Sequence, residues 1–139
     1  MPPHLKQDTE SIFEAIFALG ANFLQQGKYE KALIIFDGLM ALYPDHPRAA
    51  IAYGETLLMD GQTDIALEHF LAITKKFSLE AQVLLGAARS FMLLQKKEEA
   101  KRLLLPIIEG HVLSSSENYG LAKSIYATIM LGEFNSFGN

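Results

Sequence analysis

Apolar residues recur at spacings of three and four along most of this chain, which is the period of one face of an α-helix. Ile12, Ile16 and Leu19 follow this spacing up to a turn at Gln26-Gly27-Lys28, and a second apolar stretch then runs to Pro44. Asp8 or Thr9 is expected to cap the first helix. Further helices are expected over about 29–42, 48–59, 63–77, 79–94, 97–109 and 117–131.

The pattern returns after 34 residues, twice and without an insertion. The positions in register are Gly20, Gly54 and Ala88; Ala32, Ala66 and Ala100; Phe36, Phe70 and Leu104; and Gly27, Gly61 and Gln95. Two of these positions hold only glycine or alanine. A small residue is expected where two helices cross closely, because a larger side chain would force their axes apart. We therefore predict that Gly20, Ala32, Gly54, Ala66, Ala88 and Ala100 serve repeat packing.

A helix-turn-helix unit of 34 residues with Leu-Gly, Gly-x-Tyr-x-x-Ala, Phe and Pro at these spacings resembles the tetratricopeptide repeat. The resemblance implies an all-α fold, a right-handed superhelix of three repeats within a single domain over 1–139. The repeats would occupy 13–46, 47–80 and 81–113. A helix over 116–133 would cap the open face of the third repeat, since solenoids need a terminal cover. Residues 1–10 would form a flexible leader.

Composition narrows the class of partner and the cellular compartment. The chain has 12 Lys and Arg against 16 Asp and Glu, and this net charge of −4 does not suit a nucleic-acid-binding protein. No uncharged apolar run reaches the roughly 18 residues of a membrane span, so no stable membrane insertion is expected. Cysteine is absent, which excludes disulfides and agrees with a cytoplasmic location.

Residues that could support catalysis or bind a metal do not form a recognisable motif. The histidines, His4, His46, His69 and His111, lack the spacing of metal ligands. Acidic pairs such as Glu98-Glu99 suit the start of a helix, where carboxylates interact favourably with the helix dipole. We therefore predict no catalytic residue, no metal site and no cofactor.

The tetratricopeptide resemblance also implies a concave groove lined by the first helix of each repeat. The predicted groove residues are Phe17, Ala21, Leu24, Ile51, Glu55, Leu58, Met59, Leu85, Arg89, Met92 and Leu93. Glu14 and Arg48 add charge at neighbouring groove positions. Most of these side chains are apolar, so the groove would suit an apolar peptide or an amphipathic helix. Alternatively, some of them pack against one another or under the last helix.

The stretch Gly27-Lys28-Tyr29-Glu30-Lys31-Ala32, followed by Gly61-Gln62-x-Asp64-x-Ala66, resembles the small tetratricopeptide chaperones of bacterial type III secretion. The resemblance implies a chaperone that holds an apolar or amphipathic segment of a secreted subunit. A needle subunit is favoured over a translocator, because no extra helix is expected before the first repeat. A second small helical co-chaperone or a homodimer is possible within this family. The alternative is an adaptor or scaffold in a larger assembly.

Overall fold

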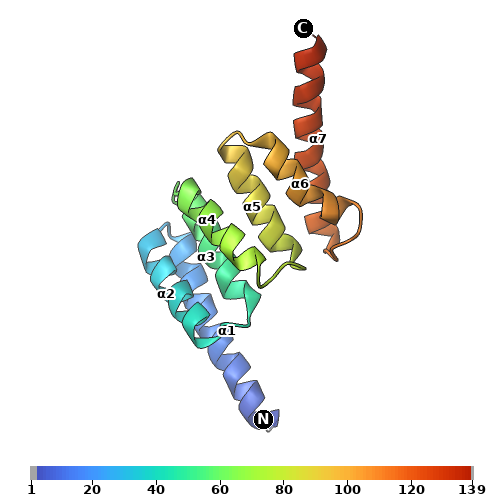
Figure 1. Cartoon of the computed structure of the whole chain (residues 1–139). Coiled ribbons are helices and arrows are strands. Elements are labelled where there is room, and N and C mark those ends of the chain that lie inside the picture. Colours follow the sequence, from blue (N-terminus) through green and yellow to red (C-terminus); the bar gives the residue numbers. More distant parts are fainter. Residues whose placement is uncertain (1–2, 139) are drawn as a thin grey trace. The chain divides into compact units, whose positions relative to one another are not determined.

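The computed structural model describes residues 3–138, with side-chain positions for 7–133, and within these residues the chain is all-α. Its helices are α1 (Pro3–Gln25), α2 (Tyr29–Leu42), α3 (Pro47–Met59), α4 (Thr63–Thr74), α5 (Ala81–Leu93), α6 (Lys97–Ile108) and α7 (Ser116–Gly138). Figure 1 shows them as successive helices joined by short turns. The prediction of an all-α chain of helix pairs is confirmed.

The chain divides into two compact units, 1–62 and 63–139. The boundary follows the turn between α3 and α4, so the two helices of the predicted second repeat belong to different units. The single domain, the repeat boundaries and the flexible leader over 1–10 remain predictions.

Both ends of the helical region extend beyond the helices expected from the sequence. We expected α1 to begin near Asp8 or Thr9, but it begins at Pro3. Proline suits the first helical position, where the N–H would have no helical partner, and no proline or glycine interrupts 4–10. At the other end α7 continues to Gly138. Met1, Pro2 and Asn139 lie outside the described residues.

Unit 1 contains α1, α2 and α3, which pack in chain order, α1 on α2 and α2 on α3. Its core is a cluster of buried apolar side chains from all three helices: Phe13, Ala32, Phe36, Leu39, Ala49 and Ala52. Phe17 lies at the edge of this cluster, with its ring centroid 5.3 Å from that of Phe36. Burial of these apolar side chains holds the three helices together.

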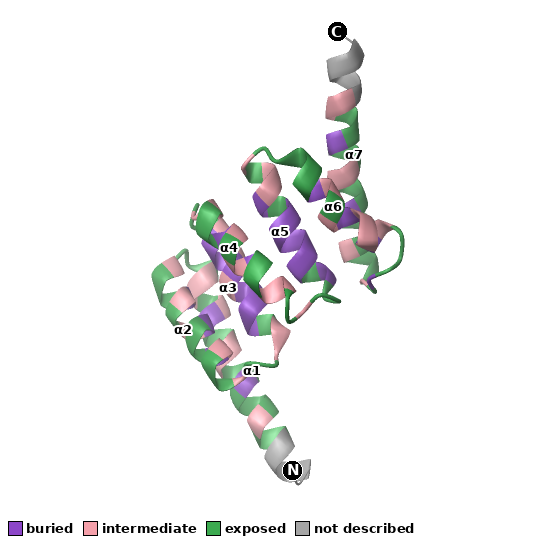
Figure 2. Cartoon of the chain, viewed as in Figure 1, coloured by how far each residue is buried: buried purple, intermediate pink, exposed green. Residues whose placement is uncertain are grey.

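Unit 2 contains α4 to α7, and α5 is its central helix. Helix α5 packs against α4, α6 and α7, while α7 packs mainly against α6. Most of α5 is therefore buried, as the purple ribbon in Figure 2 shows. The core of this unit includes Leu84 and Leu85 from α5, Leu104 and Ile107 from α6, and Ile129 from α7.

Three turns between paired helices have the same backbone geometry at the same repeat position. Gly27 and Gly61 have φ values of 72° and 78°, and Gln95 has 61°. In each turn the backbone N–H of the residue after this left-handed position donates a hydrogen bond to a carbonyl in the preceding helix. The donor and acceptor residues are Lys28 and Phe23, Gln62 and Leu57, and Lys96 and Phe91. This 6→1 bond is the Schellman motif, which needs a left-handed residue after the helix. The third repeat keeps the turn although it lacks the glycine.

Candidate partner-binding surface

All six predicted repeat-packing residues are buried. Gly20, Ala32, Gly54, Ala66, Ala88 and Ala100 all belong to the buried class. A Cβ built on Gly20 would lie 2.6 Å from Cε1 of Phe36, so α1 and α2 cross too closely for alanine. At this crossing a residue larger than glycine would therefore force the axes of α1 and α2 apart.

Gly86 has the same role in unit 2, and the repeat register did not predict it. A Cβ on Gly86 of α5 would overlap the ring of Phe70 on α4. Gly86 lies two positions before Ala88, the residue in register with Gly20 and Gly54. Its only sequence signal was a glycine inside an apolar helical stretch. Gly38 of α2 is the converse case, because nothing lies within 4 Å of the position that its Cβ would take.

The predicted groove residues of unit 1 differ in how accessible they are. Ile51 is buried, with 5% of its surface exposed, so a partner cannot contact it in this arrangement. Phe17, Ala21, Leu24, Glu55 and Leu58 are half-buried. Met59 is 55% exposed. In unit 1 the accessible part of this predicted surface therefore consists of Met59 and, in part, of the five half-buried residues.

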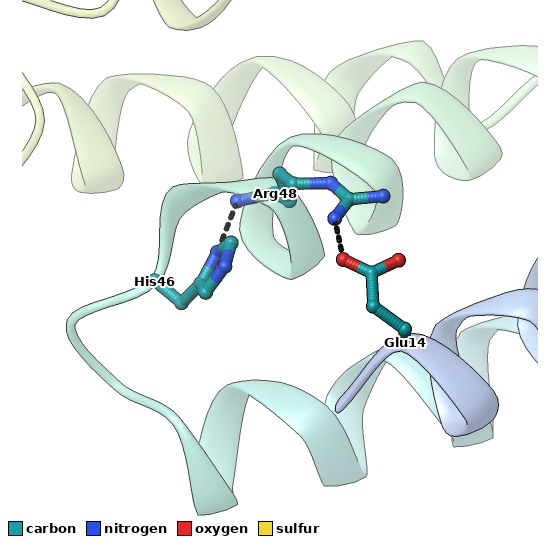
Figure 3. A network of polar contacts seen from close by, with 3 residues as sticks. All are labelled: Glu14, His46 and Arg48. Atoms are coloured by element: carbon teal, nitrogen blue, oxygen red, sulfur yellow. Dashed lines mark hydrogen bonds and ion pairs between the residues drawn. The ribbon is translucent and has the colours of Figure 1, made fainter. Parts of the chain in front are cut away.

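An ion pair joins the first two repeats beside Phe17. The Arg48 guanidinium donates to Glu14 Oε1, and both residues occupy the second position of their repeats (Figure 3). The guanidinium carbon lies 4.4 Å from the Phe17 ring centroid, which is a cation–π distance. Arg48 thus has an acidic and an aromatic partner within unit 1.

His46 has a structural position in the turn before α3. Its imidazole stacks on Phe13, with centroids 4.1 Å apart, and its Nδ1 accepts the N–H of Arg48 at 3.4 Å. The side chain therefore caps the N-terminus of α3. Among the residues that the structure describes, no group of three or more His, Asp or Glu could hold a metal ion.

Leu85 belongs to the core of unit 2, whereas Arg89, Met92 and Leu93 border a pocket. Leu85 is 3% exposed, so its predicted groove position is not accessible. Arg89 and Leu93 are exposed, and Met92 is half-buried. These three residues line a cavity of about 300 Å³ together with Ile125 and Thr128 of α7. The sequence did not predict that α7 contributes to the groove, because its contribution of Ile125 and Thr128 depends on how α7 packs beside α5.

Helix α7 packs against α6 through apolar contacts and forms an ion pair with it. Ala122 and Ile129 are buried in the core of unit 2. Lys101 Nζ lies 2.8 Å from Glu133 Oε1 and 3.1 Å from Glu98 Oε1. The hydrogen bond to Glu133, followed by that to Glu98, raises the pKa of Lys101. The same bond from Lys101 lowers the pKa of Glu133.

The family model described as the tetratricopeptide repeat matches residues 23–79. The prediction of tetratricopeptide repeats is thereby confirmed for this part of the chain. A comparison with curated protein sequences found no match. No helix in the described part of the chain combines the length and the apolar character needed to cross a bilayer.

Solved structures of type III translocator chaperones share this fold. The chaperone SycD of Yersinia enterocolitica, in an alternative dimer, has a TM-score of 0.79 and 23% identity, covering 88% of this chain and 95% of SycD. SycD in complex with a peptide of the translocator YopD has a TM-score of 0.75 and 24% identity, with the same coverages.

PcrH of Pseudomonas aeruginosa, in complex with the chaperone-binding region of PopD, has a TM-score of 0.76 and 20% identity. That match covers 89% of this chain and 95% of PcrH. The resemblance to type III secretion chaperones is thus confirmed at the level of the fold.

Proposed function

We propose that this protein is a cytoplasmic type III secretion chaperone that binds an apolar or amphipathic segment of a secreted subunit. One observation carries this proposal. Apolar side chains remain accessible along the predicted groove positions of a tetratricopeptide fold, namely Phe17, Leu24, Leu58 and Met59 in unit 1 and Met92 and Leu93 in unit 2. Accessible apolar side chains at several such positions within each unit are characteristic of a surface that a partner covers.

The mechanism requires no covalent step. Secreted subunits with amphipathic segments would self-assemble if their apolar faces met in the cytoplasm. A chaperone surface that covers one such face prevents this association, because the apolar area is already removed from water. Release then leaves the chain unchanged, so no catalytic residue, metal or cofactor enters the proposal.

The proposed cargo is a needle or translocator subunit. The preference for a needle subunit rested on an expected lack of a helix before the first repeat. Helix α1 runs without a break from Pro3 through Phe13, the predicted start of that repeat, so its longer N-terminal end is not a separate extra helix. The structurally similar SycD and PcrH bind translocator segments. We therefore place the translocator first and the needle subunit, with or without a second small co-chaperone, next.

Co-expression tests the proposal directly. The chain is produced with each secreted subunit encoded beside its own gene, and the complexes are analysed by size-exclusion chromatography with light scattering. A subunit that aggregates alone is expected to become soluble and to elute in a defined complex with the chain. If none of these subunits is solubilised, the protein is not their chaperone. The alternative, an adaptor in a larger assembly, predicts co-purification with several resident proteins and no effect on secreted subunits.

A further inference from the structure

The pocket between α5 and α7 combines apolar walls with the positive charge of Arg89. Met92 and Leu93 of α5 and Ile125 of α7 provide apolar surface, and Leu93 is 62% exposed. Thr128 lines the same pocket, and its hydroxyl donates to the carbonyl of Ser124. Arg89 supplies the only charged side chain among these lining residues.

The pocket follows from the packing of unit 2. Arg89, Met92 and Leu93 are spaced at three and four, so they share one face of α5. The same helix enters the core through Leu84, Leu85 and Ala88, and Met92 packs at the edge of this core. Because α7 packs mainly against α6, it covers this face of α5 incompletely and leaves the cavity between them.

Arg89 differs from Arg48 in its partners. Arg48 is paired with Glu14 and lies over the Phe17 ring. Arg89 is exposed, and among the side chains that the structure describes it has no hydrogen-bond or ion-pair partner. Among the described residues that line the pocket there is also no carboxylate that could neutralise Arg89. In a chain of net charge −4, this pocket is thus a local positive site with apolar surroundings.

We propose that this pocket binds a segment of the secreted partner in which an acidic side chain, Asp or Glu, adjoins a large apolar one. The apolar side chain would enter between Met92, Leu93 and Ile125. The neighbouring carboxylate would accept hydrogen bonds from the Arg89 guanidinium, an arrangement that is strong because both groups are charged. This inference rests on the proposed function and adds the chemistry by which unit 2 selects its cargo.

Peptide selection tests this chemistry without knowledge of the cargo. A phage-displayed library of 18-residue amphipathic peptides is selected on the full-length chain, and recovered sequences are compared with the unselected library. Asp or Glu is expected to be enriched next to one apolar position. For the best peptide, versions with Gln or Lys in place of that acidic residue are synthesised, and their affinities are measured by fluorescence anisotropy.

Arg89→Glu should lower the affinity for the acidic peptide by about tenfold or more, because the substitution replaces an attraction between opposite charges by a repulsion between like charges. The same variant should bind the Lys peptide more tightly than the wild type does. The matched control is Arg102→Glu, which changes the chain charge equally at an exposed residue of α6 outside the pocket. Thr128→Trp, at an exposed position, should fill the pocket and prevent binding of both the acidic peptide and its Lys version.

The outcomes separate this inference from the proposed function. Selected peptides that lack acidic enrichment, or that bind Arg89→Glu and Arg102→Glu equally, overturn the assignment of Arg89. If such peptides nevertheless lose affinity when Met59 is changed to Glu, the proposed function is retained and only this inference fails. If no peptide is selected and no secreted subunit is solubilised, both proposals fail.

Discussion

Two glycines inside the helices of unit 1 have opposite surroundings, so alanine should affect them in opposite directions. Gly20→Ala places a methyl group against the Phe36 ring, and such overpacking costs about 1–3 kcal/mol. Gly38→Ala meets nothing within 4 Å and should stabilise α2 by about 1 kcal/mol, the helix-propensity difference. Urea unfolding of both variants measures these changes. Equal effects would show that α1 and α2 do not cross at Gly20.

Gln95 occupies a left-handed position that the equivalent turns assign to glycine. A side chain at φ 61° brings its Cβ close to the next carbonyl oxygen, a strain of about 1–2 kcal/mol that glycine does not have. Gln95→Gly should therefore raise the free energy of unfolding, by about 1 kcal/mol after the greater flexibility of unfolded glycine is subtracted. Thermal unfolding followed by circular dichroism checks this. Gly61→Ala, at φ 78°, is the control and should lower stability.

At the scale of helices, the attachment of α7 to α6 is expected to depend on pH. The pKa of Glu133 is lowered in the folded state, so its contribution to stability is present above the ordinary carboxyl pKa of 4.5. This contribution is lost as the pH falls through the lowered folded-state pKa. The pKa of Lys101 is raised, so its contribution is present below 10.5 and is lost as the pH rises through the folded-state value.

Glu133→Gln should accordingly be less stable than the wild type at neutral pH, and the difference should shrink below pH 4.5. Chemical unfolding across this range measures the difference. Glu98→Gln is the comparison, because Glu98 is more exposed, at 66% against 32% of the side chain, and contacts the same lysine. A larger effect at Glu98 would contradict the assignment of Glu133 as the main partner.

Removal of α7 tests whether this helix covers the last repeat. Truncation after Leu113 should expose Leu104 and Ile107, which are buried when α7 is present. We expect the truncated chain to aggregate or dimerise, which light scattering measures. A milder test is Ile129→Ala, in which the loss of a fully buried isoleucine side chain should lower the free energy of unfolding by about 2–5 kcal/mol. A truncated chain that stays monomeric with an unchanged melting temperature would show that α7 is not a cap.

For the whole molecule, the testable question is which face binds the partner. Met59→Glu places a charge at an exposed predicted groove position, where an apolar cargo would have to bury it unpaired. Affinity for the solubilised subunit should fall more than about tenfold, which corresponds to ~1.4 kcal/mol. Both proteins should fold alike by circular dichroism, and isothermal titration calorimetry measures binding.

Ile34→Glu is the matched control, because Ile34 is 65% exposed on α2 and undergoes a comparable change from apolar to acidic. It should bind as the wild type does. Normal binding by Met59→Glu together with lost binding by Ile34→Glu would place the partner on the second helices of the repeats.

The spacing of apolar residues alone was enough to predict where the helices lie and, to within a few residues, where most of them begin and end. The range 29–42 agrees with α2, and the left-handed turn recurs at Gln95 because a 34-residue spacing repeats backbone geometry as well as side chains. The small residues at 20, 32, 54, 66, 88 and 100 are all buried, and at Gly20 the Phe36 ring leaves no room for a larger side chain. For the other five positions the role in repeat packing remains a prediction.

Tertiary packing decided which predicted surface residues remain accessible. Ile51 and Leu85 occupy the same repeat positions as half-buried Phe17, yet both are buried. Helical period places a residue on a face, but the neighbouring elements determine whether that face is covered. The same reason explains why Ile125, Thr128 and Gly86 were not foreseen. Their roles depend on the position of α7 beside α5 and of Phe70 against α5, and those distances arise only when the helices pack.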